Sequence, residues 1–256
     1  MPATAATNYW PDAKCAKAFW SQQEVPPYRQ LLSDTVEWAN PGPDEHWLDL
    51  GCGGGAISRA IWERTGGRVA EVVGTDCAAA NEDVYARLRE SLSPHPGMRV
   101  RFVCHNFSDG LGPFADGAFD HAVSGLSISY AESFDESAGR WTTAAYDRLL
   151  AEVCRVIRPG GRFVFSVNVP EPSWGRVARH SLGAALRSDH PLRFLKRSLR
   201  MMRYGRWLKR EARTGRFHYL PAEAVTAKLT AAGFDPVDHR LSYCDQAYIF
   251  KAVKPA

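Results

Sequence analysis

The sequence predicts an α/β protein with a doubly wound, mostly parallel sheet of seven strands and with helices on both faces. Strand and helix patterns alternate from residue 47 to residue 169, which is typical of parallel strands joined by crossover helices. A glycine-rich stretch directly follows the first strand, as in folds that bind ligands at the carboxyl ends of parallel strands. Only residues 244–246 separate the last two strand patterns, so we expect these strands to be antiparallel and the last strand to be reversed.

The individual elements follow from hydrophobic periodicity and from the residues that interrupt it. Pro41-Gly-Pro turns the chain into the first strand, Gly66-Gly67 ends the helix after the glycine-rich stretch, and Gly233-Phe234 ends the last helix. The predicted strands are 47–50, 70–75, 100–105, 119–124, 162–169, 237–243 and 247–253. The predicted helices are 13–21, 28–39, 56–64, 78–92, 142–157 and 221–232.

Length and composition fit a single domain with an insertion. With 256 residues, 45% of them hydrophobic, the chain can build one sizeable core. No apolar run approaches the ~20 residues that span a bilayer, and the start lacks the basic-then-apolar order of a signal peptide, so we expect a cytoplasmic protein. The six cysteines include no Cys-x-x-Cys pair, which predicts reduced thiols, no disulfide framework and no metal site.

The glycine-rich stretch Gly51-Cys-Gly-Gly-Gly55 would let a ligand approach the main chain without meeting a Cβ atom. Two interpretations compete. In the first, Gly51-x-Gly53-x-x-Ala56 is the dinucleotide fingerprint of a nicotinamide-dependent oxidoreductase, with Asp76 as the acid that binds ribose. In the second, the carboxylate of Asp49 inside the apolar strand would repel a pyrophosphate and suits a ligand with a cationic end.

Five separated motifs favour the second interpretation. They are Trp47-Leu-Asp-Leu-Gly-Cys-Gly-Gly-Gly, Gly74-Thr-Asp, Asn106-Phe107, the run 119–130 and the run 150–166. In this order they resemble the motifs of class I S-adenosylmethionine-dependent methyltransferases. The resemblance is to the small-molecule, methyltransferase type 11-like branch related to ubiquinone and menaquinone biosynthesis methyltransferases. It runs from about Trp47 to Val253 and implies a Rossmann-like fold with a reversed last strand.

The resemblance implies that the cofactor is S-adenosylmethionine and the product S-adenosylhomocysteine. Asp76 would accept hydrogen bonds from both ribose hydroxyls, and Asp49 would help to orient the cationic amino end. Cys77 would lie along the adenine, and Ser124 would lie where strand four passes the methyl donor. The residues implied to bind the cofactor are Asp49, Gly51, Cys52, Gly53, Asp76, Cys77, Asn106, Phe107 and Ser124.

Simpler structural interpretations of these residues remain open. Asp76 can cap the following helix. Asn106, where the family commonly has Asp, can form an Asx-turn with Ser108. Cys77 and Ser124 can be small space-filling residues. The glycines are the strongest signal, because a plain turn rarely needs four glycines in five positions.

Methyl transfer from a sulfonium ion is an in-line displacement that alignment and desolvation can accelerate, so a dedicated catalytic residue is not required. A hydroxyl or acidic-carbon acceptor would gain from a general base, for which the candidates are Tyr130, His180, His218 and Tyr219. Each of them can equally be a packing or surface residue. Ser124-Gly-Leu-Ser replaces the Asn/Asp-Pro-Pro-Tyr/Phe motif of relatives that N-methylate bases, and no Pro-Cys pair is present. The resemblance therefore implies O- or C-methylation of a small organic or lipid-like acceptor, with nucleic acid disfavoured.

Positive charge gathers in residues 171–216, which hold 13 basic and 3 acidic residues and so carry +10, while the rest of the chain carries −6. The family commonly inserts a helical cap over the acceptor here. A helix predicted within 192–208 has an apolar stripe beside a basic face. The stripe consists of Leu192, Leu195, Leu199 and Met202, and Phe194, Trp207 and Leu208 add further apolar side chains. This pattern predicts peripheral contact with an anionic membrane. An ordinary surface helix, an anionic acceptor and RNA or DNA binding are the alternatives.

Residues 1–45 are expected to form a helical lid, because related enzymes close the site with their N-terminal helices. Two aromatic pairs, Tyr9-Trp10 and Phe19-Trp20, would then cover the cofactor, with ordinary packing as the alternative. The function predicted from all of these features is S-adenosylmethionine-dependent methyl transfer. An RNA methyltransferase and a cofactor-binding, non-catalytic relative are the alternative functions.

Overall fold

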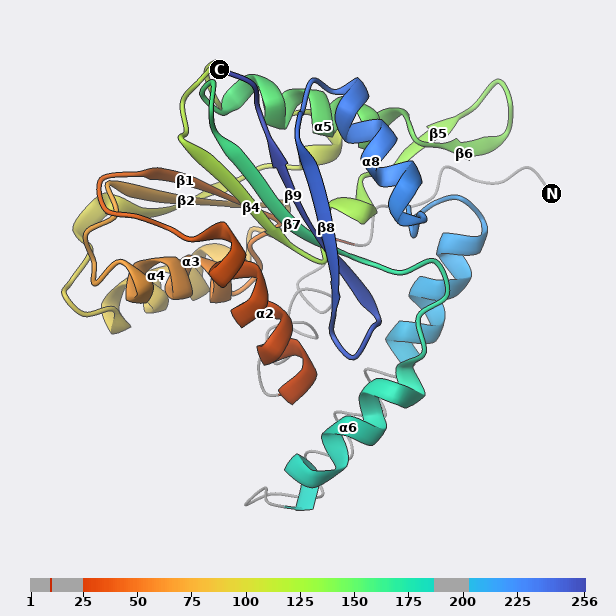
Figure 1. Ribbon diagram of the computed structural model, residues 1–256, viewed down its shortest axis with the longest axis horizontal. Helices are drawn as coiled ribbons and strands as arrows, with labels where there is room; N and C mark the ends of the chain where they lie inside the picture. Colours follow the sequence, from red (N-terminus) through yellow and green to blue (C-terminus); the bar gives the residue numbers. More distant parts are fainter. Residues whose placement is uncertain (1–9, 11–24, 187–202) are drawn as a thin grey trace.

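The computed structural model describes residue 10, residues 25–186 and residues 203–256. Its centre is a seven-stranded sheet with the order β3-β2-β1-β4-β7-β9-β8 (Figure 1). The strands are β1 (His46–Leu50), β2 (Glu71–Asp76), β3 (Val100–Cys104), β4 (His121–Gly125), β7 (Arg162–Asn168), β8 (Val237–Ser242) and β9 (Ala247–Val253). Neighbouring strands are parallel except where β9 pairs with β7 and β8. The predicted sheet is confirmed, with every strand within two residues of its expected bounds.

Helices cover both faces of the sheet (Figure 1). On one face lie α2 (Pro26–Ala39), α3 (Ala56–Arg64) and α4 (Asn81–Ser91), and on the other lie α5 (Ala144–Val156) and α8 (Ala222–Ala231). These are the helices predicted at 28–39, 56–64, 78–92, 142–157 and 221–232, with α4 beginning three residues later than expected. The predicted helix 13–21 lies outside the described residues.

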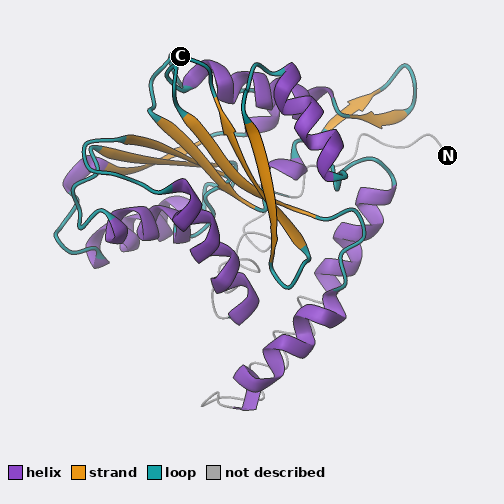
Figure 2. Ribbon diagram, viewed as in Figure 1, coloured by secondary structure: helices purple, strands orange, loops and turns teal. Residues whose placement is uncertain are grey.

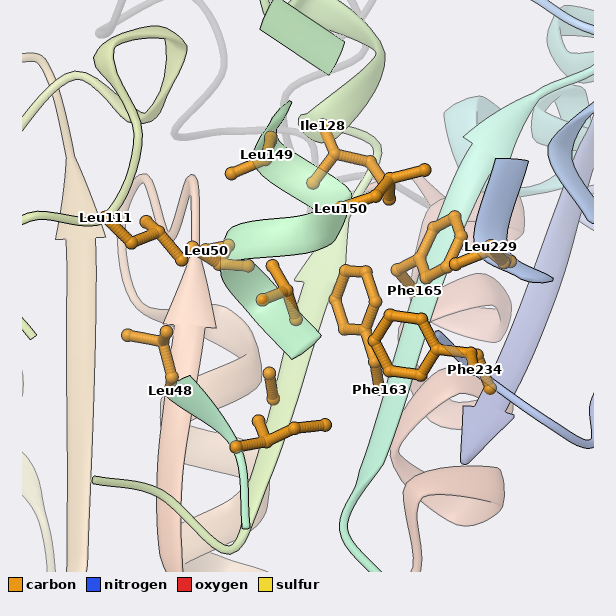
Figure 3. Close-up of a cluster of buried hydrophobic side chains, with 14 of the residues drawn as sticks. Leu48, Leu50, Leu111, Ile128, Leu149, Leu150, Phe163, Phe165, Leu229 and Phe234 are labelled. Atoms are coloured by element: carbon orange, nitrogen blue, oxygen red, sulfur yellow. The ribbon is translucent and has the colours of Figure 1, made fainter. Parts of the chain in front are cut away.

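The sheet divides the core into two layers, because successive side chains of a strand point to opposite faces. In β7, Phe163 and Phe165 belong to the layer under α5 and α8, whereas Val164 belongs to the layer under α2, α3 and α4. Figure 3 shows the first layer, in which these two phenylalanines lie near Leu229 and Phe234. Both faces of the central strands are thus apolar, as expected for a parallel sheet covered on both sides.

Two features were not predicted in detail. A hairpin of β5 (Ser133–Asp135) and β6 (Arg140–Thr142) projects away from the main sheet (Figure 2). Each of its strands has three residues, which is too short for an alternating pattern to be visible in the sequence. The predicted insertion begins with α6 (Trp174–Leu186), and residues 203–213 form another helix, in which Gly205 lies against the ring of Trp174.

The apolar stripe predicted within the insertion is only partly described. The part outside the described residues includes Leu192, Phe194, Leu195, Leu199 and Met202. Leu208 is buried with Phe217 and Tyr219, and the ring of Trp207 contacts those of Trp10 and Phe217. These two side chains therefore face the protein, which corrects their predicted place on a membrane-facing surface. Among the described helices, none combines the length and the apolar character that crossing a bilayer requires.

Candidate cofactor site

The glycine-rich stretch forms a tight bend between β1 and α3, at the carboxyl edge of the sheet. Gly51, Gly53 and Gly55 have positive φ angles of 63°, 50° and 75°, which residues with a side chain rarely adopt. The amides of Gly51 and Cys52 both donate to the carbonyl of Thr75, at 2.8 and 3.1 Å. These two hydrogen bonds hold the bend against the carboxyl end of β2.

The three glycines differ in what surrounds them. A Cβ atom on Gly51 would overlap the side chain of Ser127, and a Cβ atom on Gly55 would overlap that of Leu88. A Cβ atom on Gly53 would meet no described atom within 4 Å. Packing inside the protein therefore accounts for Gly51 and Gly55, whereas the open side of Gly53 is where a ligand can approach the main chain.

Asp76 lies on this bend at the end of β2. Its Oδ2 accepts a hydrogen bond from the amide of Gly53 at 3.0 Å, and its Oδ1 accepts one from the amide of Ala78 at 2.9 Å. Burial raises the pKa of this carboxyl group, and the hydrogen bonds from Ala78 and Gly53 oppose the rise. Because α4 begins only at Asn81, the carboxylate mainly stabilises the turn before the helix. The amide of Cys77 and the side chain of Asn81 are further hydrogen-bond partners of this carboxylate, so ribose hydroxyls would share it with these donors.

Asp49 is buried in β1, with 1% of its surface exposed. Its Oδ2 accepts hydrogen bonds from the hydroxyl of Ser58 at 2.7 Å and from the amide of Ser58 at 3.2 Å. Burial is the main reason that its pKa is raised to about 7. Its Oδ1 has no partner among the described residues, and an unpaired buried acceptor costs ~1–3 kcal/mol. This unpaired oxygen, next to the glycine bend, fits a cofactor with a cationic amino group.

Two predicted side chains make contacts inside the protein. Burial raises the pKa of the Cys52 thiol, which has the hydroxyl of Tyr85 as a hydrogen-bond partner. The Ser124 hydroxyl donates to the carbonyl of Leu50 at 2.9 Å and lies 2.6 Å from the hydroxyl of Ser127. Cys52 can therefore serve a cofactor only through its main chain. Ser124 joins β4 to β1, and its predicted place beside the methyl donor stays a prediction.

The residues predicted to contact adenine follow β2 and β3. The side-chain oxygen of Asn106 accepts from the amide of Ser108 at 3.1 Å and caps the 3-10 turn η3 (Phe107–Asp109), as in the Asx-turn alternative. The ring of Phe107 lies beside Gly51, and so beside the bend. Burial raises the pKa of the Cys77 thiol to about 12, so this thiol stays neutral and fits the space-filling interpretation.

The four candidates for a general base separate into two pairs. The hydroxyl oxygens of Tyr130 and Tyr219 lie 3.0 Å apart, and burial raises the pKa of both phenols, that of Tyr130 to about 12. His180 is exposed on α6 and bonded to the backbone of its own helix. His218 is buried, with Nε2 only 2.9 Å from the carbonyl of Ala131, and burial lowers its pKa. His180 therefore faces solvent and His218 has one ring nitrogen bonded to the backbone, and their role as bases stays a prediction.

Three residues beside the tyrosine pair were missed from the sequence. Tyr28 of α2 and Tyr243 of the β8–β9 turn bring their rings to 6.4 Å in an edge-on contact. The amide nitrogen of Asn168, the last residue of β7, donates to the hydroxyl of Tyr130 at 3.5 Å. A polar residue that ends an apolar strand was a usable signal for Asn168. No such signal marked Tyr28 or Tyr243, because the residues that surround each of them come from elements distant in the sequence.

Trp10 connects the N-terminal region to the insertion. Its indole N–H donates to Glu132 at 3.0 Å, and its ring centre lies 4.6 Å from that of Tyr130. Glu132 also forms an ion pair with Arg216 at 2.9 Å, and the Arg216 side chain is only 4% exposed. Trp10 thus covers the tyrosine pair, while its predicted role in a lid stays a prediction. The other predicted lid aromatics, Tyr9, Phe19 and Trp20, lie outside the described residues.

Comparison with known proteins identifies relatives of this chain. Residues 48–165 match a family described as a methyltransferase domain. The demethylmenaquinone methyltransferase of Thermus thermophilus is 36% identical over 135 residues, which are 52% of this chain and 52% of that protein. The thiol S-methyltransferase TMT1A of Homo sapiens is 27% identical over 150 residues, which are 59% of this chain and 53% of that protein. The chain thus spans about half the length of these curated relatives.

Solved structures share the fold at low sequence identity. A chain of the complex between the Haloferax volcanii Trm112 methyltransferase activator and a methyltransferase matches with a TM-score of 0.62 and 16% identity, covering 96% of both chains. The N-methyltransferase NodS of Bradyrhizobium japonicum, in complex with S-adenosyl-L-homocysteine, matches with a TM-score of 0.57 and 13% identity, covering 93% of this chain and 92% of NodS. In its fold, its glycine bend and the match of residues 48–165, the chain is thus similar to class I S-adenosylmethionine-dependent methyltransferases of the small-molecule type.

Proposed function

We propose that this chain is an enzyme that transfers the methyl group of S-adenosylmethionine to a small organic or lipid-like acceptor. The observation that carries the proposal is the hydrogen bond between Asp76 and the amide of Gly53, which brings a carboxylate onto a bend with an open side. The names of the relatives support the acceptor class, since one acts on a demethylmenaquinone and the other on a thiol.

The described residues fit the cofactor at three points. Asp76 would accept hydrogen bonds from the ribose hydroxyls, the open side of Gly53 would admit the cofactor, and Oδ1 of Asp49 would accept from its amino group. When bound, the cofactor supplies an electrophilic methyl group. The phenols of Tyr130 and Tyr219 stay protonated at neutral pH because burial raises their pKa values. The chain therefore contributes alignment and exclusion of water, and no phenolate base.

Isothermal titration calorimetry with S-adenosylhomocysteine, NAD and NADP tests the cofactor. We expect binding of S-adenosylhomocysteine alone, and Asp76→Ala should weaken it at least about tenfold because the ribose loses charge-assisted hydrogen bonds. Asp83→Ala, at an exposed acid in the first turn of α4, is the matched control and should bind like the wild type. Binding of NAD or NADP alone would overturn the proposal, and no binding at all would favour a non-catalytic relative.

Incubation with methyl-labelled cofactor and a fractionated cell extract tests the acceptor class. We expect the label in the lipid or small-molecule fraction, and none with the Asp76→Ala variant. Label confined to RNA would instead favour the alternative of an RNA methyltransferase. Label confined to protein would also contradict the proposed acceptor class.

A further inference from the structure

Three polar side chains meet at the carboxyl edge of the sheet, apart from the cofactor residues. Tyr130 ends the 3-10 turn η4 (Ile128–Tyr130) after β4, Asn168 ends β7, and Tyr219 precedes α8. We call Tyr130, Asn168 and Tyr219 the hydroxyl–amide cluster. Asn168 is 2% exposed and Tyr219 is 7% exposed, and polar groups buried this deeply normally have hydrogen-bond partners.

Hydrogen bonds inside the cluster do not use all of its groups. One of the two phenols donates to the other, since their oxygens are 3.0 Å apart. Asn168 donates from Nδ2 to Tyr130 at 3.5 Å and is also hydrogen-bonded to Tyr219. By this count, one phenolic proton remains without an acceptor, and Oδ1 of Asn168 is buried without a partner among the described residues. The cluster therefore presents one free donor next to one free acceptor.

A free donor beside a free acceptor matches a group that can both accept and donate a hydrogen bond. A neutral hydroxyl or thiol does both, whereas a carboxylate has no proton to give and an ammonium has no lone pair to offer. The surroundings are aromatic, because the rings of Trp10 and Phe217 lie 4.6 and 4.9 Å from the ring of Tyr130. An acceptor with an aromatic or apolar body suits such surroundings.

The cluster lies close to the candidate cofactor site. The loop that leads from β4 to Tyr130 contains Ser127, whose side chain fills the space beside Gly51. The hydroxyl of Tyr28 lies near Gly125, the residue that ends β4 before this loop, and its ring contacts that of Tyr243. A molecule held by the cluster would thus lie near a cofactor bound at the glycine bend.

We propose that the hydroxyl–amide cluster binds the methyl acceptor, with Oδ1 of Asn168 accepting a hydrogen bond from a neutral hydroxyl or thiol and a tyrosine proton donating to the same group. This inference rests on the proposed methyl transfer and narrows its acceptors to molecules with a neutral O–H or S–H group on an aromatic or apolar body. Asn168 positions the acceptor and removes no proton, because an amide oxygen is not a base at neutral pH. When the acceptor is methylated, its O–H or S–H bond breaks and the proton is released to solvent.

Binding of simple probes to the full chain saturated with S-adenosylhomocysteine tests the proposal. The probes are naphthol and naphthalenethiol, and each is compared by calorimetry with its methyl ether or methyl thioether, which lacks the proton but keeps the ring. We expect the wild type to bind each probe about tenfold more tightly than its methylated form. Oδ1 of Asn168 gains a hydrogen bond from the probe but stays unpaired when the methylated form is bound. Asn168→Ala should abolish this preference and leave the affinity for S-adenosylhomocysteine unchanged.

Two further variants keep the test decisive. Asn168→Leu keeps a branched side chain but has no acceptor, so it should abolish the preference even if Asn168→Ala does not fold. Tyr146→Phe is the matched control, because it removes another buried hydroxyl without a partner in the described chain, on α5, and should keep the preference. The inference is overturned if the wild type shows no preference, or if Asn168→Ala or Asn168→Leu retains all of it. Failure to bind S-adenosylhomocysteine at all would instead remove the proposed function.

Discussion

Gly51 and Gly53 share a left-handed backbone but have different neighbours, so the same substitution should damage them in different ways. Gly51→Ala drives a methyl group into Ser127 and should lower the free energy of unfolding by at least ~2 kcal/mol. Gly53→Ala meets no described atom and should lower it by only ~1 kcal/mol, the cost of the left-handed backbone. Its affinity for S-adenosylhomocysteine should fall at least about tenfold, since the methyl group lies on the open side. Urea unfolding and calorimetry measure the two effects.

Gly97→Ala is the matched control for Gly53→Ala. Gly97 also has a positive φ of 57° and would likewise meet no described atom within 4 Å, but it precedes β3 at the opposite edge of the sheet from the bend. It should lose similar stability and bind S-adenosylhomocysteine normally. If Gly53→Ala bound like Gly97→Ala, the open side of the bend would not be the path of the cofactor.

The buried carboxyl group of Asp49 predicts a pH dependence of stability. Its pKa in the folded protein is about 7 instead of 3.8, so between these pH values the folded protein keeps a proton that the unfolded chain has lost. The resulting contribution to the free energy of unfolding is ~4 kcal/mol at most. It is fully present below pH 3.8 and is lost as the pH rises through about 7. In cofactor-free protein, Asp49→Asn should flatten this decline in urea-unfolding free energy. An unchanged slope in the variant would show that Asp49 is already ionised.

At the scale of elements, the β8–β9 turn combines backbone strain with a place at the candidate site. Tyr243, Cys244 and Asp245 are three consecutive non-glycine residues with positive φ angles of 57°, 55° and 61°. The buried Tyr243 ring contacts Tyr28 of α2, which gives the turn a fixed position against the neighbouring helix. Strain of this kind persists only where surrounding contacts hold the backbone.

Asp245→Gly should raise the free energy of unfolding by ~1 kcal/mol, because glycine adopts the left-handed conformation without strain. The lost ion pair of Asp245 with Arg176, 3.3 Å long and exposed, contributes little. Asp238→Gly, at an exposed and extended position of β8, is the matched control and should be destabilising by ~1 kcal/mol. Equal effects of the two substitutions on urea unfolding would mean that the turn is not strained.

The elements that the sequence predicted well are those with a strong pattern of their own. Apolar runs predicted the sheet strands, and the short connection at residues 244–246 predicted the reversed one. The β5–β6 hairpin had too few residues to show a pattern, and the polar residues at the site were harder still. Asn168 and Tyr243 become neighbours of the candidate site only when β7, β8 and β9 pair in register, and a single sequence does not show that register.

At the scale of the whole molecule, charge is separated along the chain, and part of it is neutralised locally. Lys209 and Arg213 both pair with Glu171, at 2.5 and 3.1 Å, inside the basic insertion. Arg216 pairs with Glu132, which directly precedes β5. These pairs favour the surface-helix alternative for the described part of the insertion. Contact of residues 192–208 with an anionic membrane stays a proposal, and it depends on charge, since Trp207 and Leu208 face the protein.

Vesicle sedimentation tests that proposal. The protein should sediment with phosphatidylglycerol vesicles at low salt and be released at ~1 M salt, where the screening length falls to ~3 Å. Phosphatidylcholine vesicles are the uncharged control and should leave the protein in the supernatant. Protein that stays in the supernatant with anionic vesicles at low salt would leave only the surface-helix and acceptor-binding alternatives for the insertion.

The reversal of β9 has a consequence for the order in which the site can be assembled. Because β8 runs parallel to β7 and β9 runs back, the turn between them, with Tyr243, lies at the carboxyl edge beside Asn168. A nascent chain still lacking residues 237–253 could pair β1, β2, β3, β4 and β7, and so close the glycine bend. In such a chain Asn168 would lie on an unpaired strand edge. The site should therefore bind the methyl acceptor only after the hairpin of β8 and β9 has left the ribosome.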